Sequence, residues 1–104
     1  SYESFLQKRV FEPLGMKDTT FYPTKEQFAR VALTYGKNKD GKLVAAPDTL
    51  LAVPENPKHP VPAGGLYSCA GDLSKLYQMM LNKGELNGKR IISKALIVEM
   101  QKNR

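Results

Sequence analysis

Apolar side chains at helical spacing predict a helix at the start of the chain, over residues 1–11. Phe5, Leu6, Val10 and Phe11 fall on one face of this helix. We expect Pro13 to end this helix, because the residue before a proline avoids the helical conformation. Gly15 then suits a turn in the left-handed conformation.

The strongest helical pattern runs from about residue 72 to residue 81. Its apolar positions, which we expect to form part of the core, are Leu73, Leu76, Tyr77, Met80 and Leu81. Gly71 or Asp72 is expected to open the helix, since an acidic residue suits a helix N-terminus. Gly84 is a suitable C-terminal cap.

A shorter helix is predicted after Ser93, which can cap its N-terminus. Its apolar residues are Leu96, Ile97 and Met100, and Ile91 and Ile92 before it are expected to pack inward. Residues 85–88 between the two helices predict a turn.

Strand signals are short. Residues 33–35 and 42–44 flank an Asp40-Gly41 turn signal, which predicts a β-hairpin. Thr24 is expected to cap one or two helical turns before this hairpin. The chain therefore predicts a mainly α fold with a small β-hairpin, of the α+β class.

Five of the seven prolines fall within residues 46–63. A stretch of this length without regular structure is unusual inside a compact domain. It can be a flexible linker or a loop that borders a binding cleft. With 104 residues, the chain is one domain or part of one.

The net charge is +6, from 16 Lys and Arg against 10 Asp and Glu. The positive charges are dispersed and do not alternate with aromatic residues, so a basic soluble surface is favoured over nucleic-acid binding. No apolar run approaches the roughly 20 residues of a membrane span. The polar start of the chain is not a signal peptide.

The usual catalytic motifs are not found. The sequence contains no Gly-x-Ser-x-Gly, Ser-x-x-Lys or Lys-Thr-Gly motif, and Ser68 lies in the wrong spacing for a nucleophile elbow. Cys69 can be a small packing residue or a nucleophilic thiol, and the only histidine, His59, lies ten residues away. Because these motifs are missing, we predict no catalytic residue in this chain. One cysteine and one histidine provide no metal-ligand set, so we also predict no metal. We predict no cofactor either.

The double glycine Gly64-Gly65 leads through small residues into the best helix. It can form a tight turn, or it can let the backbone approach a ligand that side chains would block.

Residues 62–81 resemble the Ala-Gly-Gly-Leu-x-Ser-Thr-Ala-x-Asp-Leu segment of the serine β-lactamase-like hydrolases, with Cys69 where that family usually has Thr. Residues 11–16 are similar to the family's Phe-x-Pro-Leu-Gly-Met turn, and residues 84–93 to its Gly-x-Leu-Asn-Gly-x-x-Ile-Leu-Ser stretch. These segments also follow one another in the order found in that family, so the resemblance covers nearly all of the chain.

The resemblance implies that residues 1–104 are one fragment of a larger domain, with 46–63 as a proline-rich loop within it. We call the longer protein the parent protein. It would be a bacterial serine hydrolase, periplasmic or extracellular, acting through an acyl-enzyme on a β-lactam, a D-Ala-D-Ala peptide or an ester. Its serine, lysine and tyrosine would lie outside this chain, which alone would be inactive.

In that family the fragment would supply much of the helical region and one wall of the substrate cleft, packed against the α/β region of the parent. By position, the substrate-binding residues would be Gly64, Gly65, Leu66 and Tyr67. The expected partner is a small-molecule or peptide substrate, with no nucleic acid and no membrane span in this segment. The alternative is a non-catalytic binding module on the same scaffold.

Overall fold

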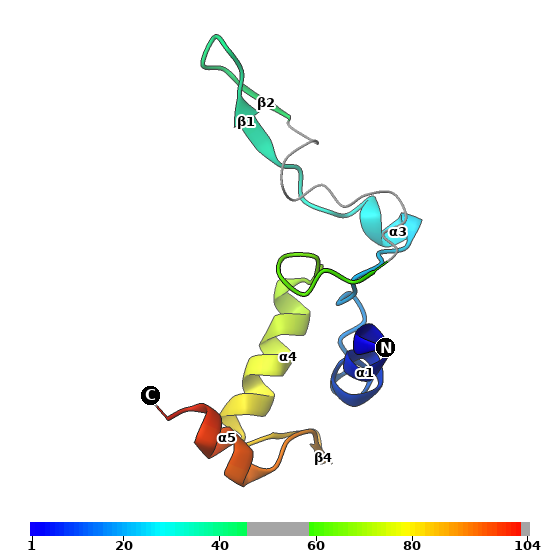
Figure 1. Ribbon diagram of the computed structural model, residues 1–104, viewed down its shortest axis with the longest axis vertical. Helices are drawn as coiled ribbons and strands as arrows, with labels where there is room; N and C mark the ends of the chain where they lie inside the picture. The colour runs from blue at the N-terminus through cyan, green and yellow to red at the C-terminus, as the bar shows by residue number, and fades with distance from the viewer. Residues whose placement is uncertain (46–58, 103–104) are drawn as a thin grey trace. The chain divides into compact units, whose positions relative to one another are not determined.

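The computed structural model describes residues 1–45 and 59–102, and consists of helices and two small antiparallel strand pairs (Figure 1). This mixture confirms the predicted α+β class. The chain divides into two compact units. The first unit comprises Ser1–Thr20 and Tyr67–Arg104, and the second unit comprises Phe21–Leu66.

The N-terminal helix of the first unit runs past Pro13. It consists of α1 (Tyr2–Leu6), a π-helical segment η1 (Gln7–Phe11) and α2 (Glu12–Leu14). The expectation that Pro13 ends the helix is therefore wrong. A proline ring collides with the carbonyl four residues earlier in a regular α-helix, and we attribute the tolerance of Pro13 to the wider turn before it. Gly15 ends the helix in the left-handed conformation, with φ 67°, as predicted.

The long helix α4 spans Ala70–Leu81, and its N-cap residue is Cys69. The prediction that Gly71 or Asp72 opens the helix is thus off by one to two residues. Asp72 is the third residue of α4, and its carboxylate is buried and bonded to other parts of the first unit. A long-range contact therefore replaces the local capping role expected for this side chain.

The buried face of α4 is rotated from the face that the sequence pattern indicates. Met79 is only 1% exposed, and Leu76 and Met80 pack partly buried against the core. The remaining three apolar positions of the predicted face, Leu73, Tyr77 and Leu81, are exposed. The prediction that all five apolar positions form the core is wrong for these three.

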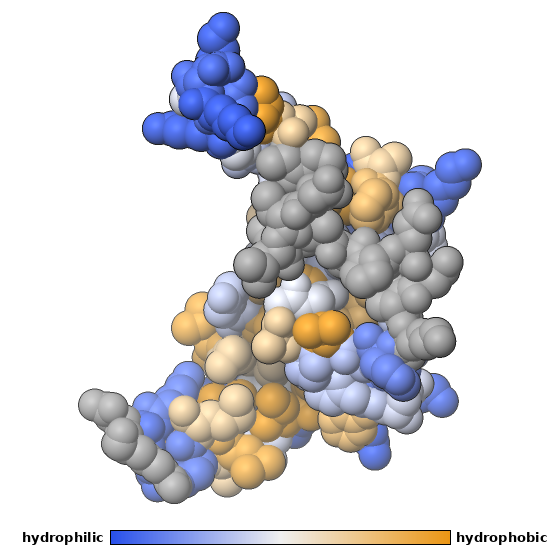
Figure 2. Space-filling view, turned by 45° about the horizontal axis from the view of Figure 1, so that its top comes forward, coloured by the Kyte–Doolittle hydropathy of each residue, from blue (hydrophilic) through white to orange (hydrophobic). Residues whose placement is uncertain are grey.

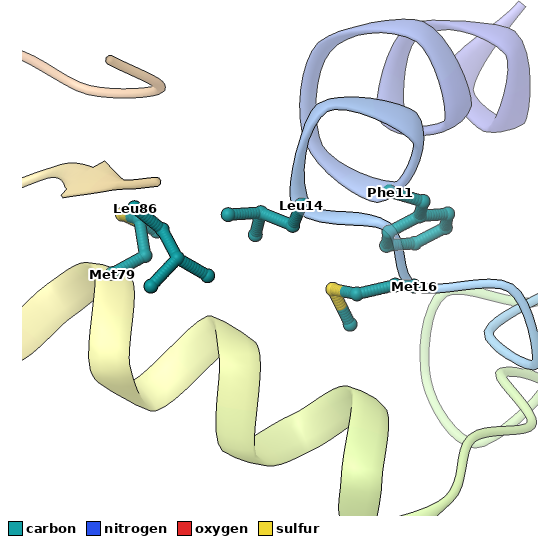
Figure 3. Packing of buried hydrophobic residues seen from close by; sticks show 5 residues of the cluster. All are labelled: Phe11, Leu14, Met16, Met79 and Leu86. Atoms are coloured by element: carbon teal, nitrogen blue, oxygen red, sulfur yellow. The ribbon is translucent and has the colours of Figure 1, made fainter. Parts of the chain in front are cut away.

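The core of the first unit joins the N-terminal helix to α4 and the strand after it. Its buried members are Phe11, Leu14, Met16, Met79 and Leu86 (Figure 3). Half-buried side chains, including Ile91 and Ile92 as predicted, pack against this cluster. The cluster holds residues 11–16 beside α4, the arrangement on which the polar site described below depends.

A Schellman motif closes the C-terminus of α4. Lys83 N–H donates to the Met80 carbonyl and Gly84 N–H to the Met79 carbonyl, at 3.1 and 2.8 Å. Both Lys83 and Gly84 have positive φ, at 57° and 95°. A Cβ on Gly84 would collide with the Ile92 carbonyl, which explains why glycine is required there.

Residues 85–90 form a hairpin rather than the simple turn expected. Strands β3 (Glu85–Leu86) and β4 (Lys89–Arg90) are joined by Asn87-Gly88, whose positive φ values suit a type I′ turn. Helix α5 (Lys94–Met100) follows, and Ser93 caps it by accepting from the Leu96 N–H, as predicted.

The second unit contains helix α3 (Lys25–Phe28) and the strands β1 (Tyr35–Lys37) and β2 (Leu43–Ala45). Thr24 caps α3 in a capping box with Gln27. The strands pair in antiparallel register, Tyr35 opposite Ala45, which confirms a hairpin one to two residues later than predicted. Residues 46–58 of the predicted proline-rich loop lie outside the described residues.

Among the residues that the structure describes, no helix has the length and apolar character needed to cross a membrane.

Candidate functional site

The predicted substrate-binding residues follow one another along the chain but fall in both units. Gly64, Gly65 and Leu66 end the second unit, and Tyr67 begins the second segment of the first. Gly65 N–H donates to the Val61 carbonyl at 2.9 Å, which closes a tight turn.

Both glycines meet a demand of this turn. Gly64 has φ 101°, in a region that side chains disfavour. A Cβ on Gly65 would lie 2.7 Å from the Val61 carbonyl oxygen. Turn geometry thus accounts for the double glycine, and its role at a substrate stays a prediction.

Main-chain hydrogen bonds hold Tyr67 in place. Its N–H donates to the Thr20 carbonyl at 2.9 Å, and its carbonyl accepts from the Thr20 N–H at 3.0 Å. These two bonds form an isolated antiparallel bridge between segments that are 47 positions apart in the sequence. The Tyr67 side chain is half-buried, whereas Leu66 before it is exposed.

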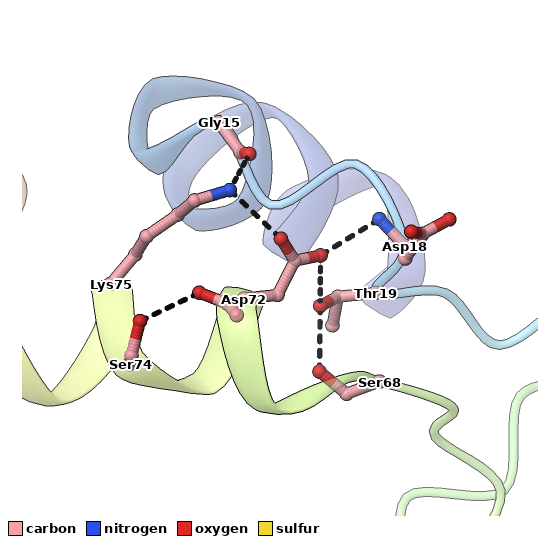
Figure 4. A network of polar contacts seen from close by, with 8 residues as sticks. Gly15, Asp18, Thr19, Ser68, Asp72, Ser74 and Lys75 are labelled. Atoms are coloured by element: carbon pink, nitrogen blue, oxygen red, sulfur yellow. Dashed lines mark hydrogen bonds and ion pairs between the residues drawn. The ribbon is translucent and has the colours of Figure 1, made fainter.

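A network of polar side chains lies beside this bridge and centres on Asp72 (Figure 4). Oδ2 of Asp72 accepts from the Asp18 N–H at 2.7 Å and from the Thr19 hydroxyl at 3.0 Å. The Thr19 oxygen also lies 2.9 Å from the Ser68 hydroxyl oxygen. Thr19 thereby connects a buried carboxylate to the residue next to Tyr67.

The other carboxylate oxygen faces a cation. Lys75 Nζ donates to Asp72 Oδ1 at 2.9 Å and to the Gly15 carbonyl at 2.5 Å. Asp72 is 4% exposed, so this ion pair and the hydrogen bonds compensate a carboxylate that has lost most of its water.

The environment of Asp72 keeps it ionised. Burial alone would raise its pKa, but the hydrogen bonds from Lys75, the Asp18 N–H and Thr19, together with the charge of Lys75, outweigh burial and lower the pKa below its ordinary value. A carboxylate with a lowered pKa is a weak base. Asp72 is therefore suited to holding its neighbours in place and not to removing a proton from Thr19 or, through it, from Ser68.

The sequence alone did not show this network. Residues 18–19 and 68–75 are far apart in the sequence, and each has an ordinary local interpretation as a loop or helix start. The available signal was an acidic residue within the first turn of a helix that also carries a lysine three positions later, a pattern typical of many surface helices.

Comparison with known proteins identifies the family. The sequence model of the family described as Beta-lactamase matches residues 1–104, the whole chain. The chain belongs to the beta-lactamase family. The family resemblance predicted from the sequence is thus confirmed.

Curated relatives of this beta-lactamase-family chain are larger proteins. Protein Rv1367c of Mycobacterium tuberculosis is 30% identical over 105 residues, covering 95% of this chain and 24% of that protein. Beta-lactamase-like protein 1 of Dictyostelium discoideum is 32% identical over 83 residues, covering 80% of this chain and 12% of that protein. The chain thus spans a quarter or less of the length of these relatives.

A solved structure supports the same fold. The octameric penicillin-binding protein homologue from Pyrococcus abyssi superposes with a TM-score of 0.69 at 31% identity. The superposition covers 98% of this chain and 20% of that one. The helices and strand pairs described above therefore form part of a beta-lactamase-like, penicillin-binding-protein-like fold.

The sequence also offers Cys69 and His59 as candidate groups. Cys69 is exposed at the N-cap of α4, so the interpretation as a packed small residue is wrong. His59 is exposed as well. Within residues 1–45 and 59–102, no three His, Cys, Asp or Glu side chains are grouped as a metal site would need.

Proposed function

We propose that this chain is part of a serine hydrolase that acts through an acyl-enzyme on a β-lactam, a D-Ala-D-Ala peptide or an ester. The observation that carries the proposal is the family match over residues 1–104, in a chain with a penicillin-binding-protein-like fold. Relatedness to a hydrolase family is the finding, and the acyl-enzyme chemistry and substrate class are our proposal.

Within the parent protein, the chain would form one wall of the substrate cleft and would contribute no reacting group. Tyr67 would line the cleft beside Gly64, Gly65 and Leu66. The lowered pKa of Asp72 supports this part of the proposal, because a weakly basic carboxylate is a poor general base for the Thr19 hydroxyl that it binds.

The exposed apolar residues of α4 support a partner surface within the parent protein. Leu73, Tyr77 and Leu81 recur every four residues along one side of the helix, and Tyr77 and Leu81 are 61% and 78% exposed. Apolar side chains also reach the surface over the lower half of Figure 2, where α4 and α5 lie. A stripe of this kind is typical of an interface. We propose that the α/β region of the parent covers it.

Acylation of the full-length parent protein tests the proposal. We expect a fluorescent penicillin to label it covalently, or p-nitrophenyl esters to be hydrolysed with a burst of product. The isolated residues 1–104 should do neither.

Saturable binding of peptidoglycan fragments without labelling or turnover would favour the non-catalytic binding module instead. Turnover by residues 1–104 that Ser68→Ala abolishes would show that the reacting serine lies within this chain, contrary to the proposal. Periplasmic or extracellular location and bacterial origin stay predictions.

A further inference from the structure

Three consecutive residues of the first unit hold the backbone around Tyr67. The Asp18 N–H binds Asp72, the Thr19 hydroxyl contacts Asp72 and Ser68, and the Thr20 backbone pairs with Tyr67. Both residues of the Tyr67–Ser68 segment are therefore held in place. Main-chain hydrogen bonds hold Tyr67, and a side-chain contact with Thr19 holds Ser68.

The two oxygens of Asp72 serve different parts of this arrangement. Oδ1 binds Lys75, which also reaches the Gly15 carbonyl and so closes the turn after the N-terminal helix. Oδ2 orients Thr19, and Thr19 reaches Ser68 (Figure 4). Loss of the contacts of Lys75 with Asp72 and Gly15 should destabilise the fold. Loss of the hydrogen bond between Thr19 and Ser68 should instead loosen the segment after Leu66.

We propose that Thr19 is a positioning residue that acts through Ser68, fixing Tyr67 for substrate binding in the parent enzyme. This inference rests on the proposed function, since it assumes that Tyr67 lines the cleft. Thr19 is only 2% exposed, and its hydroxyl contacts both the Asp72 carboxylate and the Ser68 hydroxyl. Ser68 is exposed, so water can replace its bond with little loss of stability. The Thr19–Ser68 bond therefore restricts the conformation of the Tyr67–Ser68 segment more than it stabilises the fold.

The test compares Ser68→Ala, Thr19→Val and Thr19→Ser in the full-length parent protein. Ser68→Ala and Thr19→Val remove the Thr19–Ser68 bond, and Thr19→Ser keeps a hydroxyl at position 19. Steady-state hydrolysis of nitrocefin and a p-nitrophenyl ester gives KM and kcat, and the thermal midpoint reports stability. We expect both bond-removing variants to raise KM by about threefold to tenfold, with kcat changed less than about twofold. Thr19→Ser should restore the wild-type KM.

Ser74→Ala is the matched control, because Ser74 lies on the same helix and its hydroxyl donates to the Gly71 carbonyl, away from Thr19 and Ser68. It should leave KM unchanged. The double variant Thr19→Val with Ser68→Ala should be no worse than Thr19→Val alone, since Thr19→Val already removes the Thr19–Ser68 bond that Ser68→Ala would remove.

Two results separate this inference from the proposed function. If the wild-type parent protein is labelled or turns over substrate, but Ser68→Ala and Thr19→Val keep the wild-type KM, the positioning role is wrong and the proposed function stands. If the wild-type parent shows neither labelling nor turnover, the proposed function fails and the inference fails with it. A loss of thermal stability that accounts for the whole activity change in both variants would also contradict a positioning role.

Discussion

At the scale of single residues, Asp72 connects parts of the first unit that are far apart in the sequence. It is a buried carboxylate whose direct and indirect partners lie on two separate segments of the chain, residues 15–19 and residues 68–75. Replacing Asp72 leaves the hydroxyl of Thr19, a residue that is also buried, without one of its hydrogen-bond partners.

Asp72→Asn should therefore destabilise the protein by about 1–3 kcal/mol, because Lys75 loses its counter-ion and one amide donor replaces an acceptor. Urea unfolding of the full-length protein measures this. Glu85→Gln is a matched control, since it removes a surface ion pair with Arg90 and should cost less than about 1 kcal/mol. An equal loss of unfolding free energy in Asp72→Asn and Glu85→Gln would contradict the claim that the burial of Asp72 makes its contacts important.

Asp72 also predicts how stability depends on pH. Its pKa is lower in the folded protein than in the unfolded chain, so the unfolded chain binds the proton more readily. The stabilisation is fully present above the unfolded pKa and is lost as the pH falls through the folded pKa. Urea unfolding between about pH 7 and about pH 3 should show falling stability in acid, and Asp72→Asn should flatten part of that slope.

At the scale of elements, local signals predicted the existence of helices better than their ends and faces. The Ser93 cap, the Thr24 cap and the left-handed Gly15 follow from local chemistry and are confirmed. The start of α4 is shifted because the contacts of Asp72 come from residues 18–19, which no local pattern indicates.

The strands were predicted less well for a related reason. Asn38 accepts through Oδ1 from the N–H groups of Asp40 and Lys42, and this Asx-type contact sets the hairpin register one to two residues further on. The Asn87-Gly88 hairpin was visible as a turn, but strands of two residues carry too little pattern to be recognised.

The glycines around β3 and β4 allow a direct test of turn chemistry. Gly84→Ala should cost about 2–4 kcal/mol, because φ is 95° and the new Cβ would meet the Ile92 carbonyl. Gly88→Ala is the comparison, since φ is 75° but no atom lies within 4 Å of the new Cβ. Its cost should be about 1 kcal/mol, from the left-handed conformation alone. Thermal unfolding distinguishes the two, and equal costs would show that the close approach to Ile92 is unimportant.

At the scale of the whole molecule, the exposed stripe on α4 is the main departure from the predicted core. The helical pattern alone could not indicate which apolar positions pack within this chain and which face a partner, because both surfaces are apolar. Met79, outside the predicted set, is buried, whereas Leu73, Tyr77 and Leu81 are exposed.

If the parent protein covers this stripe, a charge placed there should destabilise the full-length protein. Tyr77→Asp should cost about 2–4 kcal/mol through lost burial and an unpaired carboxylate. Gln78→Asp is a matched control, because Gln78 is the next residue of the same helix and is also exposed. It should change stability by less than about 0.5 kcal/mol. Similar stability of the two variants would mean that the stripe is not covered.

The position of Cys69 has a practical consequence. It is the single thiol of the sequence, it is exposed, and it stands between Ser68 and the first residue of α4. A maleimide fluorophore attached there would report directly on the surroundings of Tyr67 and the Thr19–Ser68 bond. Within residues 1–104, spectroscopy at this site therefore requires no engineered cysteine and no removal of a competing one.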